Sequence, residues 1–99
     1  MGNVKTYYVY IMASRKDGVL YVGMTSNIRK RAWEHRKGLG DGFTKKYLAK
    51  RLVHIEQCSD VMSAIEREKK LKKWNREYKI NLIEKENPEW EDLYDGMFV

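Results

Sequence analysis

Four side chains that can act on a phosphate group lie near the start of the chain: Tyr10, Tyr21, Arg31 and His35. The guanidinium fork of an arginine matches phosphate oxygens and stays charged. Arg31 therefore suits the charge that develops during phosphodiester hydrolysis. A phenol can align or deprotonate an attacking water, but its ordinary pKa of ~10 means that a base needs positive charge beside it. Spacing does not distinguish the two tyrosines, and His35 could share their work or support Arg31.

The fifth candidate is Glu68, which a helical pattern places in the middle of an apolar stripe. The other members of this stripe are Val61, Ala64, Ile65 and Leu71. A buried carboxylate is costly unless it is paired or holds a metal. One or two carboxylates, with water and substrate oxygens, commonly hold Mg²⁺. A single carboxylate at Glu68 therefore indicates one metal ion that is held weakly until the substrate binds. The competing interpretation is an ion pair with Lys72, one helical turn later.

The order of these residues resembles the signature of the GIY-YIG nucleases. Tyr8-Val9-Tyr10 corresponds to the first triplet and Tyr21-Val22-Gly23 to the second, and the arginine and histidine follow on the next helix. The first triplet begins with tyrosine instead of glycine, and the second has valine for isoleucine. Neither change removes a side chain that does chemistry.

The resemblance covers about residues 5–83. The later stretch AIEREKKLKKW and the closing NPEWEDLY are similar to the small stand-alone, single-domain branch of this superfamily. That branch is UPF0213-like, and the match also resembles the N-terminal domain of the excinuclease that belongs to the superfamily. The resemblance thus implies one domain over residues 1–99, with its core at about 5–83.

In this family two motif tyrosines, a helix arginine, a nearby histidine and a later glutamate form the active site with one divalent cation. The resemblance therefore assigns catalysis to Tyr10, Tyr21, Arg31, His35 and Glu68, with Mg²⁺ or Mn²⁺ on Glu68. The implied function is a metal-dependent endonuclease that hydrolyses DNA phosphodiester bonds. Branched, flapped and damaged structures, including repair intermediates, are the candidate substrates.

Local sequence patterns indicate how these residues are positioned. Alternation predicts a strand from Lys5 to about Met12, and an Asp-Gly turn then favours a hairpin. A return strand over Val19–Gly23 would place Tyr21 on the same sheet face as Tyr10 if the register permits. Gly23 would leave room for a backbone or a phosphate to approach.

A basic helix is predicted next, over about Asn27–Lys37, capped by Thr25 or Ser26. His35 lies on its apolar arc, and Arg31 lies beside that arc one turn away. The remaining predicted elements are a glycine-rich loop over 38–42, a strand over Arg51–Gln57, a helix capped by Ser59 or Asp60 and running to about Trp74, a helix over about Glu77–Lys85 and a short last helix over about 88–94. Together they predict an α/β (α+β) fold with a three-stranded antiparallel sheet in β-β-α-β-α-α order.

The net charge of +6 on 99 residues favours a polyanionic partner. The candidate nucleic-acid-binding residues are Arg29, Lys30, Lys45, Lys46 and Lys72. Two of them adjoin Phe43 and Tyr47, which are able to stack on bases. A single cysteine and the absence of any long apolar run or signal peptide predict a cytoplasmic protein without membrane contact.

Two other functions are consistent with this sequence. A nucleic-acid-binding module of the same fold would bind in a salt-dependent way without cutting. A basic interaction domain would instead meet an acidic protein, with Glu68 serving stability. The full set of catalytic residue types favours the nuclease, while DNA versus RNA, the physiological metal, the pathway, protein partners and the oligomeric state stay open.

Overall fold

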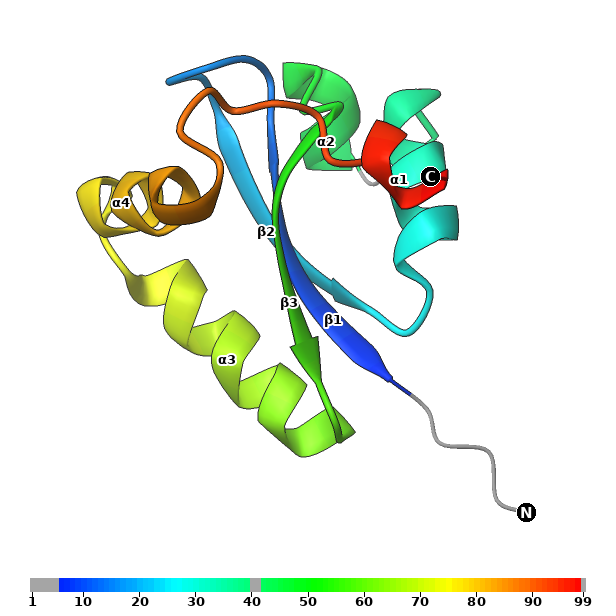
Figure 1. The fold of residues 1–99 in the computed structure, drawn as a ribbon, viewed down its shortest axis with the longest axis vertical. Coiled ribbons are helices and arrows are strands. Elements are labelled where there is room, and N and C mark those ends of the chain that lie inside the picture. The colour runs from blue at the N-terminus through cyan, green and yellow to red at the C-terminus, as the bar shows by residue number, and fades with distance from the viewer. Residues whose placement is uncertain (1–5, 40–41, 99) are drawn as a thin grey trace.

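A three-stranded antiparallel sheet organises the computed structural model, which describes residues 6–39 and 42–98. The strands are β1 (Tyr7–Ala13), β2 (Leu20–Thr25) and β3 (Arg51–Cys58), in the order β2-β1-β3. The helices are α1 (Ile28–Arg36), α2 (Gly42–Tyr47), α3 (Val61–Lys73) and α4 (Arg76–Glu86), followed by a 3₁₀ helix over Asp95–Phe98. The predicted α+β fold with helices around a three-stranded antiparallel sheet is confirmed (Figure 1).

Strand β1 lies in the middle of the sheet, and helices cover both of its faces. Val9 and Ile11 face a core that includes Ala64 and Leu71 of α3 and Ile83 of α4. The alternate residues Tyr10 and Met12 face a second core with Ile28 and Ala32 of α1. The sheet therefore separates α3 and α4 on one face from α1 and α2 on the other (Figure 1).

The ends of α1 follow from polar side chains and one glycine. Asn27 is the N-cap, because its side chain accepts a hydrogen bond from the Lys30 amide at 3.1 Å. The prediction of Thr25 or Ser26 as cap was wrong: the Thr25 hydroxyl accepts from the Asn27 amide at 3.0 Å and turns the chain one step earlier. Gly38, at φ +76°, ends the helix as predicted.

Two segments differ from the sequence-based prediction. Residues 40–41 of the expected loop lie outside the described residues, and an unexpected helix, α2, begins at Gly42. No helix forms over 88–94: Trp90 has φ +57°, which an α-helix does not permit. The oxygen of the Asn87 side chain accepts from the Glu91 amide at 3.0 Å, four residues on, and so closes a turn instead of capping a helix.

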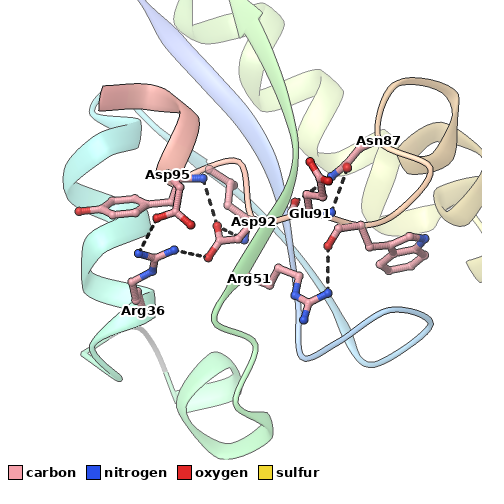
Figure 2. A network of polar contacts seen from close by, with 9 residues as sticks. Arg36, Arg51, Asn87, Glu91, Asp92 and Asp95 are labelled. Atoms are coloured by element: carbon pink, nitrogen blue, oxygen red, sulfur yellow. Dashed lines mark hydrogen bonds and ion pairs between the residues drawn. The ribbon is translucent and has the colours of Figure 1, made fainter. Parts of the chain in front are cut away.

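The segment over residues 87–95, here called the C-terminal segment, covers the outer edge of β3. Its Leu93 amide donates to the Leu52 carbonyl at 2.8 Å, and the Asp92 carboxylate accepts from the Leu52 amide at 3.2 Å. The same carboxylate and that of Asp95 accept from Arg36 at 2.6 and 3.0 Å (Figure 2). The C-terminal segment therefore ties the last turn of α1 to an edge strand.

A second polar network joins α3 to β3. The Glu56 carboxylate accepts from Arg67 Nε at 2.7 Å and from its terminal nitrogen at 3.0 Å, and from His54 Nε2 at 2.8 Å. Burial acts to raise the pKa of Glu56, but the hydrogen bonds from His54 and Arg67 outweigh it and lower the pKa to about 2.

Among the described residues, no helix is long and apolar enough to cross a membrane.

We expect Glu56 to make folding stability depend on acidity. Its pKa is lowered in the folded state, so its contribution of about 2 kcal/mol is present above the ordinary value of 4.5 and lost as the pH falls toward about 2. Denaturant unfolding at several pH values should show Glu56→Gln to be less stable at neutral pH and to lose less on acidification. Exposed Glu66→Gln is the control, and the same acid slope in wild type and Glu56→Gln would contradict the assignment.

The two carboxylates that hold Arg36 should differ in their effect on stability. Asp92→Asn should lower the free energy of unfolding by about 1–2 kcal/mol, because a charge-assisted hydrogen bond at a half-buried site is lost. Asp95→Asn should cost less than about 1 kcal/mol, because 73% of the Asp95 side chain is exposed. Urea titrations measure both values, and equal losses would mean that the contact to Leu52 adds nothing.

Candidate active site

A buried chain of hydrogen bonds links β1, α1 and α2. The Tyr10 hydroxyl lies 3.1 Å from His35 Nε2, and His35 Nδ1 lies 3.1 Å from the Thr44 hydroxyl. All three residues are at most 2% exposed. Tyr10 of β1 and Thr44 of α2 bond to the two ring nitrogens of His35, so these two residues set the orientation of the imidazole.

Tyr21 lies against this chain on the same sheet face. Its ring centroid is 6.3 Å from that of Tyr10 and 5.7 Å from that of His35. The register pairs Tyr21 with Met12 and Gly23 with Tyr10, which makes the two tyrosines diagonal neighbours across the strands. The shared face predicted for them is thus present, and Tyr21 is only half-buried whereas Tyr10 is enclosed.

Gly23 makes room for the Tyr10 ring. A Cβ atom at this position would lie 2.5 Å from the Tyr10 hydroxyl oxygen and 2.9 Å from the ring of Tyr21. The expectation that Gly23 leaves space for a backbone or a phosphate was therefore wrong, because the phenol fills that space. The glycine is required by the same buried hydroxyl that bonds to His35.

Arg31 lines a polar hollow of about 180 Å³ where β2 passes into α1. The other lining residues are Thr25, Ser26, Asn27, Lys30 and Glu34. The Arg31 side chain is 43% exposed, and its Nε lies 3.3 Å from the Glu34 carboxylate. An ion pair this exposed contributes little to stability, so the guanidinium can exchange Glu34 for another anion.

Glu68 lies on α3, which packs on the opposite face of the sheet from Tyr10. Its side chain is 23% exposed and its carboxylate lies 3.6 Å from Lys72, the ion pair that the sequence offered as the alternative to a metal. The expected apolar stripe is only partly buried, because Val61 is 39% exposed while Ala64 and Leu71 are enclosed. No group of three or more His, Cys, Asp or Glu suited to a metal occurs within residues 6–39 and 42–98.

The structure therefore gathers three of the five predicted catalytic residues into direct contact: Tyr10, Tyr21 and His35. Arg31 and Glu68 each pair with a neighbour on their own helix. The five predicted nucleic-acid-binding residues are all exposed: Arg29, Lys30, Lys45, Lys46 and Lys72.

The sequence did not point to the role of Thr44, because α2 was not predicted. Phe43, one residue earlier, extends the aromatic cluster outward: its ring centroid lies 5.8 Å from that of Tyr21 and 4.8 Å from that of Tyr47. Phe43 and Tyr47 are 42% and 43% exposed. The signal for this surface in the sequence was the mixture of aromatic and basic residues over 43–47.

Residues 6–81 match the family model of the GIY-YIG catalytic domain. The chain belongs to the GIY-YIG family. The members of this family are generally endonucleases, whose substrate is nucleic acid. The C-terminal segment lies outside the matched residues.

Similar proteins have about the same length as this chain. A UPF0213 protein of Syntrophus aciditrophicus is 42% identical over 83 residues, which is 83% of this chain and 93% of that relative. One from Bacillus licheniformis is 36% identical over 87 residues, covering 88% and 89%. The solution NMR structure of a UPF0213 protein from Bacillus halodurans has a TM-score of 0.55 at 29% identity and covers 88% of this chain and 92% of that one. The predicted UPF0213-like branch is thus confirmed.

We expect Gly23→Ala to disrupt the Tyr10–His35 hydrogen bond. The added methyl group must displace a buried ring, which should cost about 1–3 kcal/mol of stability and change the NMR shifts of the His35 imidazole. Gly42→Ala is the matched control, because a Cβ at Gly42 meets nothing within 4 Å. Unchanged His35 shifts in Gly23→Ala would contradict this account of the glycine.

Proposed function

We propose that this protein is a divalent-metal-dependent endonuclease that hydrolyses phosphodiester bonds in DNA, acting as one domain over residues 1–99. The observation that carries the proposal is the buried chain from Tyr10 through His35 to Thr44, with half-buried Tyr21 against it. Burying a phenol and an imidazole removes both groups from water, and the hydrogen bond between them offsets this desolvation cost only in part. The presence of this pair on the signature residues of a nuclease family supports a role in catalysis.

The two tyrosines take different roles in this proposal. Tyr10 is 1% exposed, so its hydroxyl positions His35 and does not meet the substrate. Tyr21 is open on one side and can hydrogen-bond to the attacking water. The water oxygen forms a new bond to phosphorus and loses a proton to solvent, while the bond to the leaving oxygen breaks and that oxygen takes up a proton from solvent. The rings of Tyr10 and His35 fix the direction from which Tyr21 presents that water.

Arg31 neutralises the charge that builds up on the phosphate oxygens. Its guanidinium is accessible in the hollow at the end of β2, and its exposed pair with Glu34 can be replaced by a phosphate. The fork of the arginine can hold two oxygens at once, which fits a phosphodiester better than a lysine would.

Glu68 is the residue that would hold the metal. Its carboxylate is partly exposed and has a 3.6 Å ion pair with Lys72, which an incoming cation can displace. This arrangement fits Mg²⁺ or Mn²⁺, which are commonly bound by one or two carboxylates with water and substrate oxygens. Such an ion, when bound, would supply Lewis-acid stabilisation of the leaving oxygen. Because α1 and α3 lie on opposite faces, Arg31 and Glu68 can meet a common substrate only around the free edge of β2.

The surface beside the tyrosines fits nucleic acid. Lys45 and Lys46 lie on α2 next to the exposed rings of Phe43 and Tyr47, and Phe43 contacts Tyr21. Lysines bind the backbone, and aromatic rings stack on bases that are not paired. This combination supports a substrate with an unpaired stretch near the scissile bond, such as a flap, a fork or a repair intermediate.

A cleavage screen tests the proposal. Single strands, duplex, flap, fork, four-way junction and RNA are incubated with Mg²⁺ or Mn²⁺, and we expect cutting of DNA that contains an unpaired stretch. Glu68→Gln and Arg31→Ala should each reduce the cleavage rate by about 10²–10³-fold, because each removes charge stabilisation in the transition state. Both should fold as wild type does.

Glu66→Gln is the matched control for Glu68→Gln, since Glu66 is exposed on the same helix. It should cut at the wild-type rate. Equal cleavage by wild type, Glu68→Gln and Arg31→Ala would sink the nuclease proposal. Salt-dependent binding without any cutting would favour the binding module instead.

A further inference from the structure

The β1–β2 hairpin and α4 enclose a basic groove that no catalytic role explains. Two hollows of about 300 and 340 Å³ adjoin there, and both are lined by Val19 and Arg76. One also includes Lys79, and the other includes Arg15 and Asp17. We call this pair of hollows the hairpin groove. It carries three cations against one carboxylate.

Arg76 holds the groove together. Its terminal nitrogen donates to the carbonyls of Asp17 and Gly18 at 2.7 and 2.6 Å, which fixes the tip of the hairpin to the first turn of α4. Lys16, next to the groove, is engaged by Glu89 at 3.8 Å. Contacts between the hairpin and α4 therefore set the walls of the groove.

Arg76 and Lys79 lie close enough in the hairpin groove for their charges to repel each other. Burial first, and the charge of Arg76 second, lower the pKa of Lys79. The Lys79 amine has a long hydrogen bond of 3.4 Å to the Lys72 carbonyl, a neutral partner that does not offset its charge. An anion seated between Arg76 and Lys79 would relieve this repulsion, as phosphate groups do in basic clefts.

The position of the groove relative to Arg31 suggests which anion it takes. Strand β2 runs from the hairpin to the start of α1 (Figure 1). Its first residue, Leu20, lines the hairpin groove, and its last, Thr25, lines the Arg31 hollow. Five strand steps span about 17 Å. Phosphates on one strand of a duplex advance about 3.4 Å per nucleotide along the axis, so the two sites are about five nucleotides apart. No strand pairs with the outer edge of β2 in the described part of the chain.

We propose that the hairpin groove is a second phosphodiester-binding site, which takes the backbone of the substrate about five nucleotides from the bond at Arg31. The proposal rests on the nuclease function above. It assigns Arg15, Arg76 and Lys79 to backbone contact, in addition to the basic residues of α1 and α2. Because phosphate contacts orient a protein on its substrate without reading bases, the groove would set direction and not sequence preference.

The test measures DNA affinity at several salt concentrations, with Ca²⁺ in place of Mg²⁺ to suppress cutting. The double variant Arg15→Gln/Lys79→Gln keeps Arg76, whose hydrogen bonds hold the hairpin. We expect about 10-fold weaker binding of a DNA duplex of about 20 base pairs at low salt. The slope of log K against log salt should be shallower by about 1.8, because two cations that each contribute about 0.9 are removed. Thermal unfolding should be unchanged.

Lys85→Gln is the matched control, because Lys85 is an exposed cation in the last turn of the same helix. It should shift affinity by less than about twofold. If wild type binds DNA and the double variant keeps its affinity and slope, the groove is not a backbone site, and the nuclease proposal is untouched. If wild type binds no nucleic acid, both proposals fail. Tighter, Lys79-dependent binding of polyglutamate than of DNA would assign the groove to an acidic protein and overturn our proposal.

Discussion

The buried hydroxyl of Tyr10 imposes the constraint on which this structure depends. A phenol in the core needs a hydrogen-bond partner, because leaving it unpaired costs about 1–3 kcal/mol. His35 provides that partner from α1, and Thr44 fixes the other nitrogen of the imidazole from α2. The same hydroxyl excludes a side chain at position 23 of β2. The Tyr10 hydroxyl thus helps to position α1 and α2 and requires a glycine at position 23 of β2.

A second constraint, the burial of the sheet on both faces, explains why the catalytic candidates fall into two groups. The sheet is buried on both faces, so residues that alternate along β1 belong to different cores. Tyr10, Tyr21 and His35 share one face, whereas Glu68 comes from the helix on the other. A phosphate at the free edge of β2 can be approached from both faces. The ion pairs of Arg31 with Glu34 and of Glu68 with Lys72 are weak, so each side chain can exchange its partner.

The strands and the long helices could be predicted because their signals are local. Alternation in β1 placed Tyr10 on its correct face, and Asp60 caps α3 as one of two predicted residues. The cap of α1 was assigned wrongly because Thr25 and Asn27 are equally good caps, and only the preceding turn decides between them. Helix α2 escaped prediction because its six residues gain their stability from tertiary contacts, such as the bond from Thr44 to His35.

The helix predicted over residues 88–94 does not form because tertiary contacts outweigh the local signal. Asn-Pro-Glu is a good helix start in isolation, but burial of the Trp90 ring and the bonds of Asn87 to Val53 and Glu91 require an extended path across β3. That path closes one of the two sheet edges (Figure 2). An unpaired edge strand is a liability, and proteins usually cover it. Here the C-terminal segment covers β3 while β2 keeps its outer edge free of any strand in the described residues, with a cationic hollow at each end. An edge left open between two basic sites is expected where a polyanion, and not another strand, is the natural neighbour.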